Sequence, residues 1–414
     1  MKTAAMTALL FVAAVSAQAH VATLENFTAK PILADLKDLQ ALNIPVVAKE
    51  ESSQVGYAVV TPQMQQRLQE YAHANGKCGG FEDVSQDMQG TTLVSEGFSK
   101  MLSNLAELKQ KNDLYERAPF RALVAQQNPA LTAAIDEISV TNMQETVNWL
   151  SSFPTRYNKA SQPNIHVEEM KKRLEAMLAT SKIPYEVSLI DHTSTKQKSV
   201  RVRLTGSQRP NEIVVLGGHL DSINMSWGGG DKAPGADDNA SGSSNIYEAL
   251  RIVSQKAQPQ RTVDFFWYAG EESGLLGSAE IAKTYKAQKA DVVAVLQLDM
   301  TLFPGSGELV IGSMNDFTSS WLRDYLKANN ETYIKARIVD DKCGYGCSDH
   351  ASWYRQGYPT LMPFESKMND SNSNIHTARD LVTKDSNFNH SVAYTKIALL
   401  FAMDLANSTA RQPF

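Results

Sequence analysis

The hydrophobic pattern from about residue 130 onward predicts helices that alternate with strands. Apolar positions have helical spacing in 142–153 and 166–181, and they alternate with polar positions in 185–192 and 199–206. Three further stretches are almost continuously apolar, as buried strands are: IVVLGG (213–218), VDFFWYAG (263–270) and VVAVLQL (292–298). Continuous apolar strands that alternate with helices indicate an α/β fold with a mostly parallel central sheet flanked by helices.

The first nineteen residues have the pattern of a secretory signal peptide. Lys2 supplies the positive start, Leu9 to Val15 the apolar stretch, and Ala17-Gln18-Ala19 the small-residue cleavage site. This apolar run is too short to anchor the chain in a bilayer, and we expect an exported protein, extracellular or periplasmic. The formal net charge of −5 and the pI near 6.0 give no reason to expect nucleic acid or an anionic membrane as a partner.

The segment after the signal peptide has a sequence pattern that differs from that of the rest of the chain. Residues 56–85 have the pattern of a strand, a helix begun by Pro62 and a glycine-rich end, and a polar, helix-prone connector follows. A small domain in this position suggests a propeptide with its connector over residues 20–110; an accessory domain is the alternative. One larger domain is expected over residues 111–414.

Polar residues of metal-ligand types follow each of the three buried strands. His219 and Asp221 follow the first strand, Glu271 and Glu272 the second, and Asp299 the third. Ligands of open α/β sheets bind at the carboxyl ends of the strands, so these side chains are expected to share one crevice. The loop APGADDNASG (233–242) can place Asp237 over the same crevice, and His350 and His376 are further candidates.

The charge of this crevice favours a metal site. Four carboxylates, those of Asp237, Glu271, Glu272 and Asp299, cannot all stay ionised close together without compensation. The stretches that carry them contain no lysine or arginine, which leaves protonation or divalent cations. Mixed oxygen and imidazole ligands suit zinc and its first-row neighbours.

Five residues suffice for two zinc ions at the usual co-catalytic spacing of about 3.5–4 Å. If Asp237 is shared, one ion takes His219 and Asp299, and the other takes Glu272 and His376. Glu271 is then left over beside a ligand, where a general base has to be. Asp221 would accept the other imidazole N–H of a ligand histidine and orient its ring.

The chain has three cysteines, Cys78, Cys343 and Cys347. In an oxidising compartment the close pair in CGYGC can form a small disulfide ring. Cys78 is left without a partner. It is either a free thiol or, as a second hypothesis, a thiolate that caps a zinc ion until the propeptide is removed.

Taken together, these stretches resemble the secreted bacterial leucyl aminopeptidases, which are two-zinc exopeptidases. The resemblance covers roughly residues 135–410 and rests on GGHLDS, PGADDNASG, GEESGLLGS, LQLDM, CGYGCSDHASW, MPFESKMND and IHTARD. It implies the same five zinc ligands, Asp237 as the bridge, Glu271 as acid/base, and a cis peptide between Asp237 and Asp238, with Asp238 helping to aim its neighbour.

The resemblance also implies an apolar substrate pocket with the disulfide at its rim. By position its lining is Met300, Tyr345, Met362, Phe364 and Ile375. Such a lining fits a substrate with leucine or a similar apolar residue at its N-terminus. Met368 and Ser371 stand where aromatic side chains are expected, and His350 is expected to be structural.

The expected activity is hydrolysis of the first bond of peptides with a free N-terminus, by a monomer that its own propeptide inhibits. Glu271 would take a proton from the attacking water and pass it to the leaving amine. A related-fold carboxypeptidase is one alternative, but it needs basic residues to hold a C-terminal carboxylate. A glutaminyl cyclase would hold a single zinc, and a non-catalytic binding homologue would have lost ligands or the base.

Overall fold

The structure is a computed structural model. It describes residues 29–50, 54–75, 77, 80–85, 88, 110, 128–226 and 232–411. The predicted signal peptide, Cys78 and most of the predicted connector lie outside these residues. No helix within the described part of the chain is long and apolar enough to cross a membrane.

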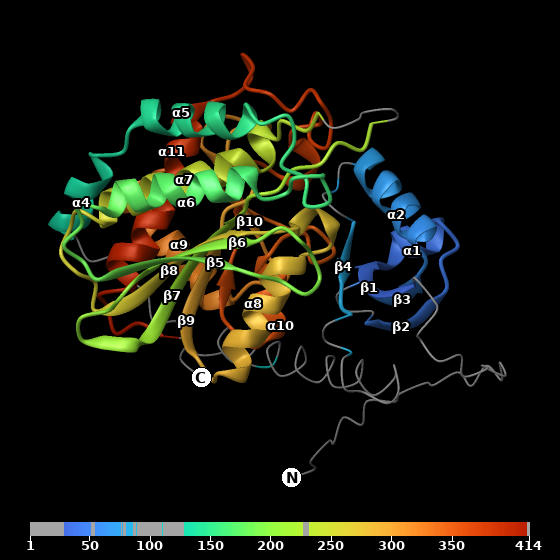
Figure 1. The fold of residues 1–414 in the computed structure, drawn as a ribbon, viewed down its shortest axis with the longest axis horizontal. Helices are drawn as coiled ribbons and strands as arrows, with labels where there is room; N and C mark the ends of the chain where they lie inside the picture. The colour runs from blue at the N-terminus through green and yellow to red at the C-terminus, as the bar shows by residue number, and fades with distance from the viewer. Residues whose placement is uncertain are drawn as a thin grey trace, which may run out of the picture.

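A six-stranded sheet forms the centre of the larger domain (Figure 1). Its strand order is β12 (Thr360–Leu361), β9 (Asp291–Gln297), β7 (Arg209–His219), β8 (Arg261–Tyr268), β6 (Ser199–Leu204) and β5 (Tyr185–Ile190). The first four strands run parallel to one another, whereas β6 pairs antiparallel with both β8 and β5. The sheet is therefore mixed, and the prediction of a mostly parallel sheet is wrong. The short connection between β5 and β6 is the reason, because a parallel return needs a long crossover.

Helices cover both faces of this sheet. One face carries α4 (Pro129–Ile135), α5 (Val140–Ser151), α6 (Ile165–Leu178), α7 (Gly242–Val253), α9 (Ser320–Asn329) and α11 (Phe388–Leu399). The other face carries α8 (Leu276–Ala287) and α10 (His350–Arg355). Alternate residues of one strand point to opposite faces: Leu216 packs in the first core and Val215 in the second. Burial on both faces explains why these strands are almost continuously apolar.

A smaller sheet lies beside the central one. It consists of β11 (Arg337–Asp341), β10 (Val310–Met314) and β13 (Pro363–Phe364). β10 pairs parallel with β11 and antiparallel with β13. Residues 360–364 pass from β12 into β13 and so connect the two sheets.

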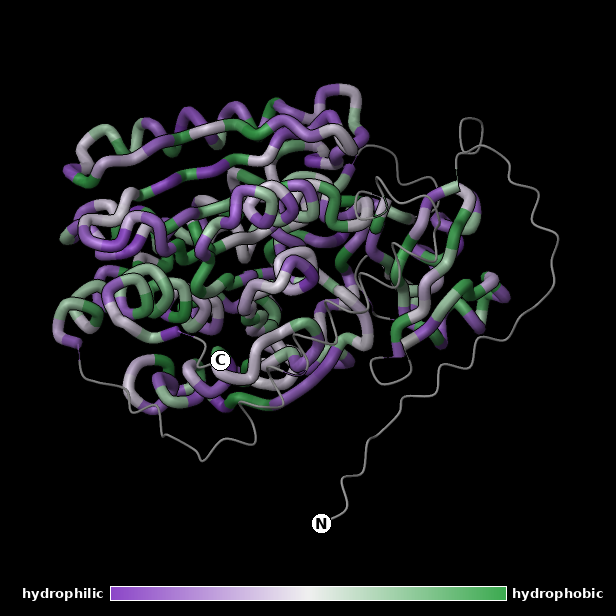
Figure 2. Tube along the Cα trace, turned by 90° about the horizontal axis from the view of Figure 1, so that it is seen from below, coloured by the Kyte–Doolittle hydropathy of each residue, from purple (hydrophilic) through white to green (hydrophobic). Residues whose placement is uncertain are grey.

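An N-terminal subdomain, defined here by its described residues between 29 and 85, forms a separate lobe beside the larger domain (Figures 1 and 2). Its antiparallel sheet has the order β2 (Val46–Glu50), β3 (Val55–Val60), β1 (Lys30–Asp35) and β4 (Phe81–Asp83). Helices α1 (Leu36–Ala41) and α2 (Pro62–Ala74) complete it. Ile32, Leu39, Leu68 and Phe81 form a core of its own. A helix begins at Pro62, as predicted.

Candidate metal centre

The carboxyl ends of three neighbouring strands bring the predicted site residues together. His219 ends β7, Glu271 and Glu272 lie in a short turn after β8 (Glu271–Ser273), and Asp299 follows β9. All four side chains are buried. The Nε2 atom of His219 lies 3.3 Å from Oδ1 of Asp299. The convergence of these side chains that the strand ends predict is therefore present.

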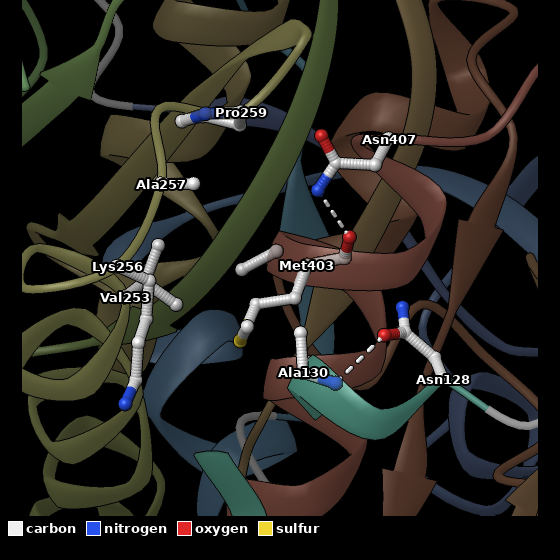
Figure 3. A pocket seen from close by; sticks show the side chains of 9 residues that line it. Asn128, Ala130, Val253, Lys256, Ala257, Pro259, Met403 and Asn407 are labelled. Atoms are coloured by element: carbon white, nitrogen blue, oxygen red, sulfur yellow. Dashed lines mark hydrogen bonds between the residues drawn. The ribbon is translucent and has the colours of Figure 1, made fainter. Parts of the chain in front are cut away.

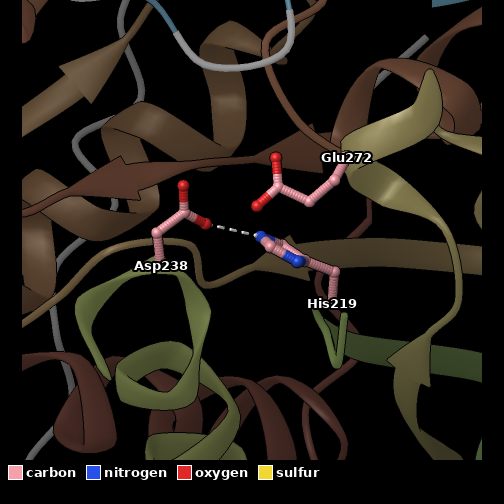
Figure 4. A group of neighbouring side chains, drawn as sticks. All are labelled: His219, Asp238 and Glu272. Atoms are coloured by element: carbon pink, nitrogen blue, oxygen red, sulfur yellow. Dashed lines mark ion pairs between the residues drawn. The ribbon is translucent and has the colours of Figure 1, made fainter. Parts of the chain in front are cut away.

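Asp238 lies between two histidines. Its Oδ1 atom is 3.0 Å from Nε2 of His219, and its Oδ2 atom is 2.9 Å from Nε2 of His376. Glu272 Oε2 is 3.1 Å from the same nitrogen of His376. Figure 4 shows His219, Asp238 and Glu272 pointing toward one another, and each offers a ligand atom within 4.8 Å of the others.

The position between the histidines was predicted for Asp237, and this prediction is wrong by one residue. The Asp237 carboxylate instead accepts hydrogen bonds from the backbone N–H of Leu302 (3.1 Å) and from Nδ2 of Asn372 (3.0 Å). The cis peptide likewise joins Asp238 to Asn239, not Asp237 to Asp238. Two adjacent aspartates are chemically identical, so residue types alone do not show which one points at the histidines.

The carboxylates of the cluster favour a positive charge at its centre. Burial raises the pKa of Glu272 to about 7 and that of Glu271 well above 4.5. Burial works to lower the pKa of the two histidines, but Asp299 near His219 and Glu272 near His376 raise both well above 6.5. The carboxylates thus stabilise a positive charge at this place, as a proton or as a metal ion.

Asp221 contacts both sides of the site. Its backbone carbonyl oxygen is 3.1 Å from Nδ1 of His219, and its Oδ1 atom is 3.5 Å from the same nitrogen. Its carboxylate also accepts the backbone N–H groups of Glu271 (3.0 Å) and Glu272 (3.2 Å). Asp221 therefore connects His219 with the turn that carries both glutamates, and its predicted role in orienting the His219 ring stays a prediction.

A buried cation beside the site was missed from the sequence. The side chain of Arg156 is fully buried and donates hydrogen bonds to backbone carbonyl oxygens, those of Leu150, Leu220, Pro234 and Gly235. Burial lowers its pKa to about 10, so it stays protonated at neutral pH and faces the charges of Asp380 and Asp221. Arg156 lies in SSFPTRY, outside every stretch that indicated the site. Its hydrogen bonds go to backbone atoms, which every residue has, so residue types could not predict its partners.

The predicted pocket residues form one apolar cluster. Buried side chains of Met300, Tyr345, Met362, Phe364 and Ile375 pack with Met314, Met368, Cys343 and Cys347. The predicted disulfide joins Cys343 to Cys347. Met368 therefore belongs to the cluster, whereas the Ser371 hydroxyl donates to the Met368 carbonyl (2.9 Å). His350 is buried, and its Nε2 atom is 3.2 Å from the backbone carbonyl oxygen of Asp316.

The donor set fits zinc. It combines imidazole nitrogens with carboxylate oxygens, which is the set that zinc and its first-row neighbours prefer. Apart from its contact with His376, the buried Glu272 carboxylate has no hydrogen-bond partner among the described residues. A buried carboxylate of this kind is costly unless a cation compensates it.

A small pocket elsewhere in the domain has a different chemistry (Figure 3). It is lined in part by residues between the end of α7 and the start of β8. His219 lies at the carboxyl ends of the parallel strands, so the pocket lies at their opposite ends. Its lining residues are Asn128, Ala130, Val253, Lys256, Ala257, Pro259, Ala402, Met403 and Asn407. This lining offers no carboxylate or imidazole that could hold a metal ion.

The fold and the site define a metallo-hydrolase whose ligands lie at the carboxyl ends of the central strands. Residues 199–409 match the model of peptidase family M28, and the chain belongs to this family. Leucine aminopeptidase 1 of Emericella nidulans is 39% identical over 65% of this chain and 71% of its own length. Leucine aminopeptidase 1 of Trichophyton equinum is 35% identical over 72% of this chain and 87% of its own length. These relatives are fungal, whereas the resemblance suggested bacterial ones.

The fold also matches solved bacterial structures. The LapA aminopeptidase of Legionella pneumophila has a TM-score of 0.76 and 26% identity, covering 92% of this chain and 99% of that one. LapB of the same organism has a TM-score of 0.75 at 24% identity, which shows the fold alone. The family and the named relatives identify this protein as a metallo-aminopeptidase that acts on peptide bonds.

Proposed function

We propose that the protein is a secreted, two-zinc aminopeptidase that removes N-terminal leucine or similar apolar residues from peptides. The observation that carries the proposal is the Asp238 carboxylate, whose two oxygens face His219 at 3.0 Å and His376 at 2.9 Å. One carboxylate between two histidines is the arrangement that a shared ligand of a metal pair requires.

The chain offers a complete ligand set for each ion. His219 and Asp299 would hold one, Glu272 and His376 the other, and Asp238 both. Bound zinc would supply Lewis-acid chemistry, polarising the scissile carbonyl and making water more acidic. The remaining steps are left to side chains of the protein.

Glu271 would act as the general acid/base. It is buried beside Glu272, and Asp221 holds its backbone N–H at 3.0 Å. Burial raises its pKa well above 4.5, which brings the carboxyl group closer to the working pH of a proton carrier. In the proposed reaction Glu271 takes a proton from the attacking water and hands it to the leaving amine.

The apolar cluster around Met300, Tyr345 and Phe364 would receive the substrate's first side chain. Met300 follows directly after the predicted ligand Asp299, so the cluster borders the metal centre. An apolar lining favours leucine over charged residues because burial of an unpaired charge is costly.

The N-terminal subdomain would act as an inhibitory propeptide. It contacts the turn that carries both glutamates: Gln69 Nε2 donates to the Glu272 carbonyl oxygen, and the Asp83 N–H donates to that of Gly274, each at 3.1 Å. A side chain at Gly274 would meet Asp83, because a Cβ atom there would lie 2.9 Å from the Asp83 nitrogen.

The same subdomain also contacts the disulfide loop and α10. Glu82 forms an ion pair of 2.5 Å with Arg355, and both side chains are almost fully buried. Lys77 Nζ lies 6.0 Å from the ring centroid of Tyr345 in the apolar cluster. The subdomain therefore lies against both the turn and the pocket loop, where it would hinder substrate entry until it is removed.

The test is hydrolysis of leucine-p-nitroanilide by the processed protein, with zinc counted on the same sample. We expect activity that a chelator abolishes and zinc restores, at two zinc ions per chain. One zinc ion per chain without aminopeptidase activity would contradict the proposal and favour a cyclase. Two ions without activity after complete processing would contradict the proposed substrate.

A further inference from the structure

The loop before Asp238 is held through its backbone from two sides. Arg156 donates to the carbonyl oxygens of Pro234 and Gly235. On the other side, Asp380 accepts hydrogen bonds from the three N–H groups that follow in the chain. A guanidinium group thus binds the carbonyl oxygens and a carboxyl group binds the N–H groups of one short segment.

Asp380 makes all three of the latter contacts. Its Oδ1 and Oδ2 atoms each lie 3.0 Å from a backbone nitrogen, those of Asp237 and Asp238 respectively. Its own carbonyl oxygen accepts the N–H of Ala236 at 3.1 Å. Asp380 is 1% exposed, so water cannot replace these acceptors. Hydrogen bonds from N–H groups to a buried carboxylate are strong.

Asp380 also connects two candidate ligands of the same ion. Asp380 lies four residues after His376, in IHTARD, and its Oδ2 atom accepts the backbone N–H of Asp238. Asp238 and His376 are in contact through their side chains at 2.9 Å. The distance between these two ligands therefore depends on a residue that is itself no ligand.

The site contains this arrangement twice. Asp221, two residues after His219, uses both carboxylate oxygens to accept the N–H groups of Glu271 and Glu272. Each histidine segment thus carries an aspartate that binds two consecutive N–H groups of a carboxylate segment. A merely local turn contact looks different: Asp83, for example, accepts the N–H of Ser85 two residues away.

We propose that Asp380 is a positioning residue that holds Asp238 against His376 and thereby sets the affinity of the ion bound by Glu272 and His376. The inference rests on the proposed two-zinc site. Removing one acceptor would leave a backbone N–H of the loop unpaired in a buried place and let Asp238 shift. Partners of metal ligands typically contribute about 10–100-fold to metal affinity.

The test compares Asp380→Asn with wild type and with Asp385→Asn, a change at an exposed aspartate five residues away. Asparagine keeps the shape but turns an amide NH₂ toward one of the two N–H donors. Zinc affinities are measured on the processed protein by competition with a chelator, together with urea unfolding of the metal-free form. We expect Asp380→Asn to weaken the binding of one zinc ion by about 10–100-fold, and that of the other, which shares only Asp238 with it, by clearly less.

Unchanged affinity for both ions would overturn the inference, and so would equal weakening of both, since a purely structural role loosens the whole site. If wild type binds fewer than two zinc ions, the proposed function itself fails, and this is seen before any variant is compared. If Asp380→Asn does not fold, Asp380→Glu keeps both acceptors but displaces them by one methylene. The same selective weakening is then expected, and two unchanged affinities would overturn the inference.

Discussion

Gln69 of the N-terminal subdomain donates a hydrogen bond to the backbone carbonyl oxygen of Glu272, 3.1 Å away, in the turn that carries the candidate general base. The contact joins residues about two hundred positions apart in the chain. It places the subdomain against the turn of the candidate metal centre. Weaker docking of the subdomain should therefore change the activity of the unprocessed chain.

Glu82→Gln should raise the activity of the unprocessed chain. The Glu82–Arg355 pair is buried between the subdomain and α10, and loss of one partner of a buried pair costs about 3–5 kcal/mol. We expect at least ~10-fold more leucine-p-nitroanilide hydrolysis before processing, because weaker docking frees the site more often. Glu70→Gln, at an exposed position of α2, is the matched control and should change nothing. Equal latency of the two variants would refute the contact as a determinant of inhibition.

Glu271→Gln should separate catalysis from metal binding. The side chain is buried at the site, but the predicted ligand sets are complete without it. We expect a loss of about 10²–10⁴ in kcat with two zinc ions retained, since general acid/base catalysis contributes that much. The measurement is kcat together with the zinc content of the same preparation. A variant that keeps near-normal turnover would show that another group carries the proton.

Asp238→Asn and Asp237→Asn form a second pair of variants. Asp238 faces both histidines, whereas Asp237 faces Leu302 and Asn372. Loss of the negative charge at Asp238 should therefore remove zinc and activity together. Asp237→Asn should retain two zinc ions. Zinc content after gel filtration decides between the two positions, and the opposite pattern would restore Asp237 as the shared ligand.

The stability of the protein should fall in acid partly through His166. Burial lowers its pKa to about 3, with a further contribution from the nearby Arg156 charge, against 6.5 when unfolded. The unfolded chain therefore binds this proton between about pH 6 and pH 4 and the folded chain does not, so stability decreases as pH falls. Each pH unit in this window costs about 1.4 kcal/mol.

His166→Asn removes the titrating group and should flatten this part of the profile. Urea unfolding at several pH values measures the free energy of unfolding of both proteins. The variant will be less stable at neutral pH because its buried contact with Gln197 changes, but its slope between pH 6 and pH 4 should be smaller by about 1.4 kcal/mol per unit. Identical slopes would show that His166 is not the group responsible.

The sequence predicted the elements whose pattern depends on burial. β7, β8 and β9 were visible as apolar runs, and the polar residues at their ends converge because parallel strands share an edge. The antiparallel β5 and β6 were visible as strands, but their direction depends on a short connection that the apolar pattern does not encode.

Other features of the site could not be predicted from residue types. The choice between Asp237 and Asp238 depends on local backbone conformation, and the two residues are chemically the same. Arg156 and Asp380 act on backbone atoms of a distant loop, and backbone atoms are identical in every residue. Such contacts become visible only when the chain is folded.

The most direct test of the central claim is a crystal structure of the zinc-loaded protein with anomalous data collected on both sides of the zinc absorption edge. The account predicts two zinc peaks about 3.5–4 Å apart, with one oxygen of Asp238 on each. Peaks bridged by Asp237, or a single peak at these residues, would contradict it.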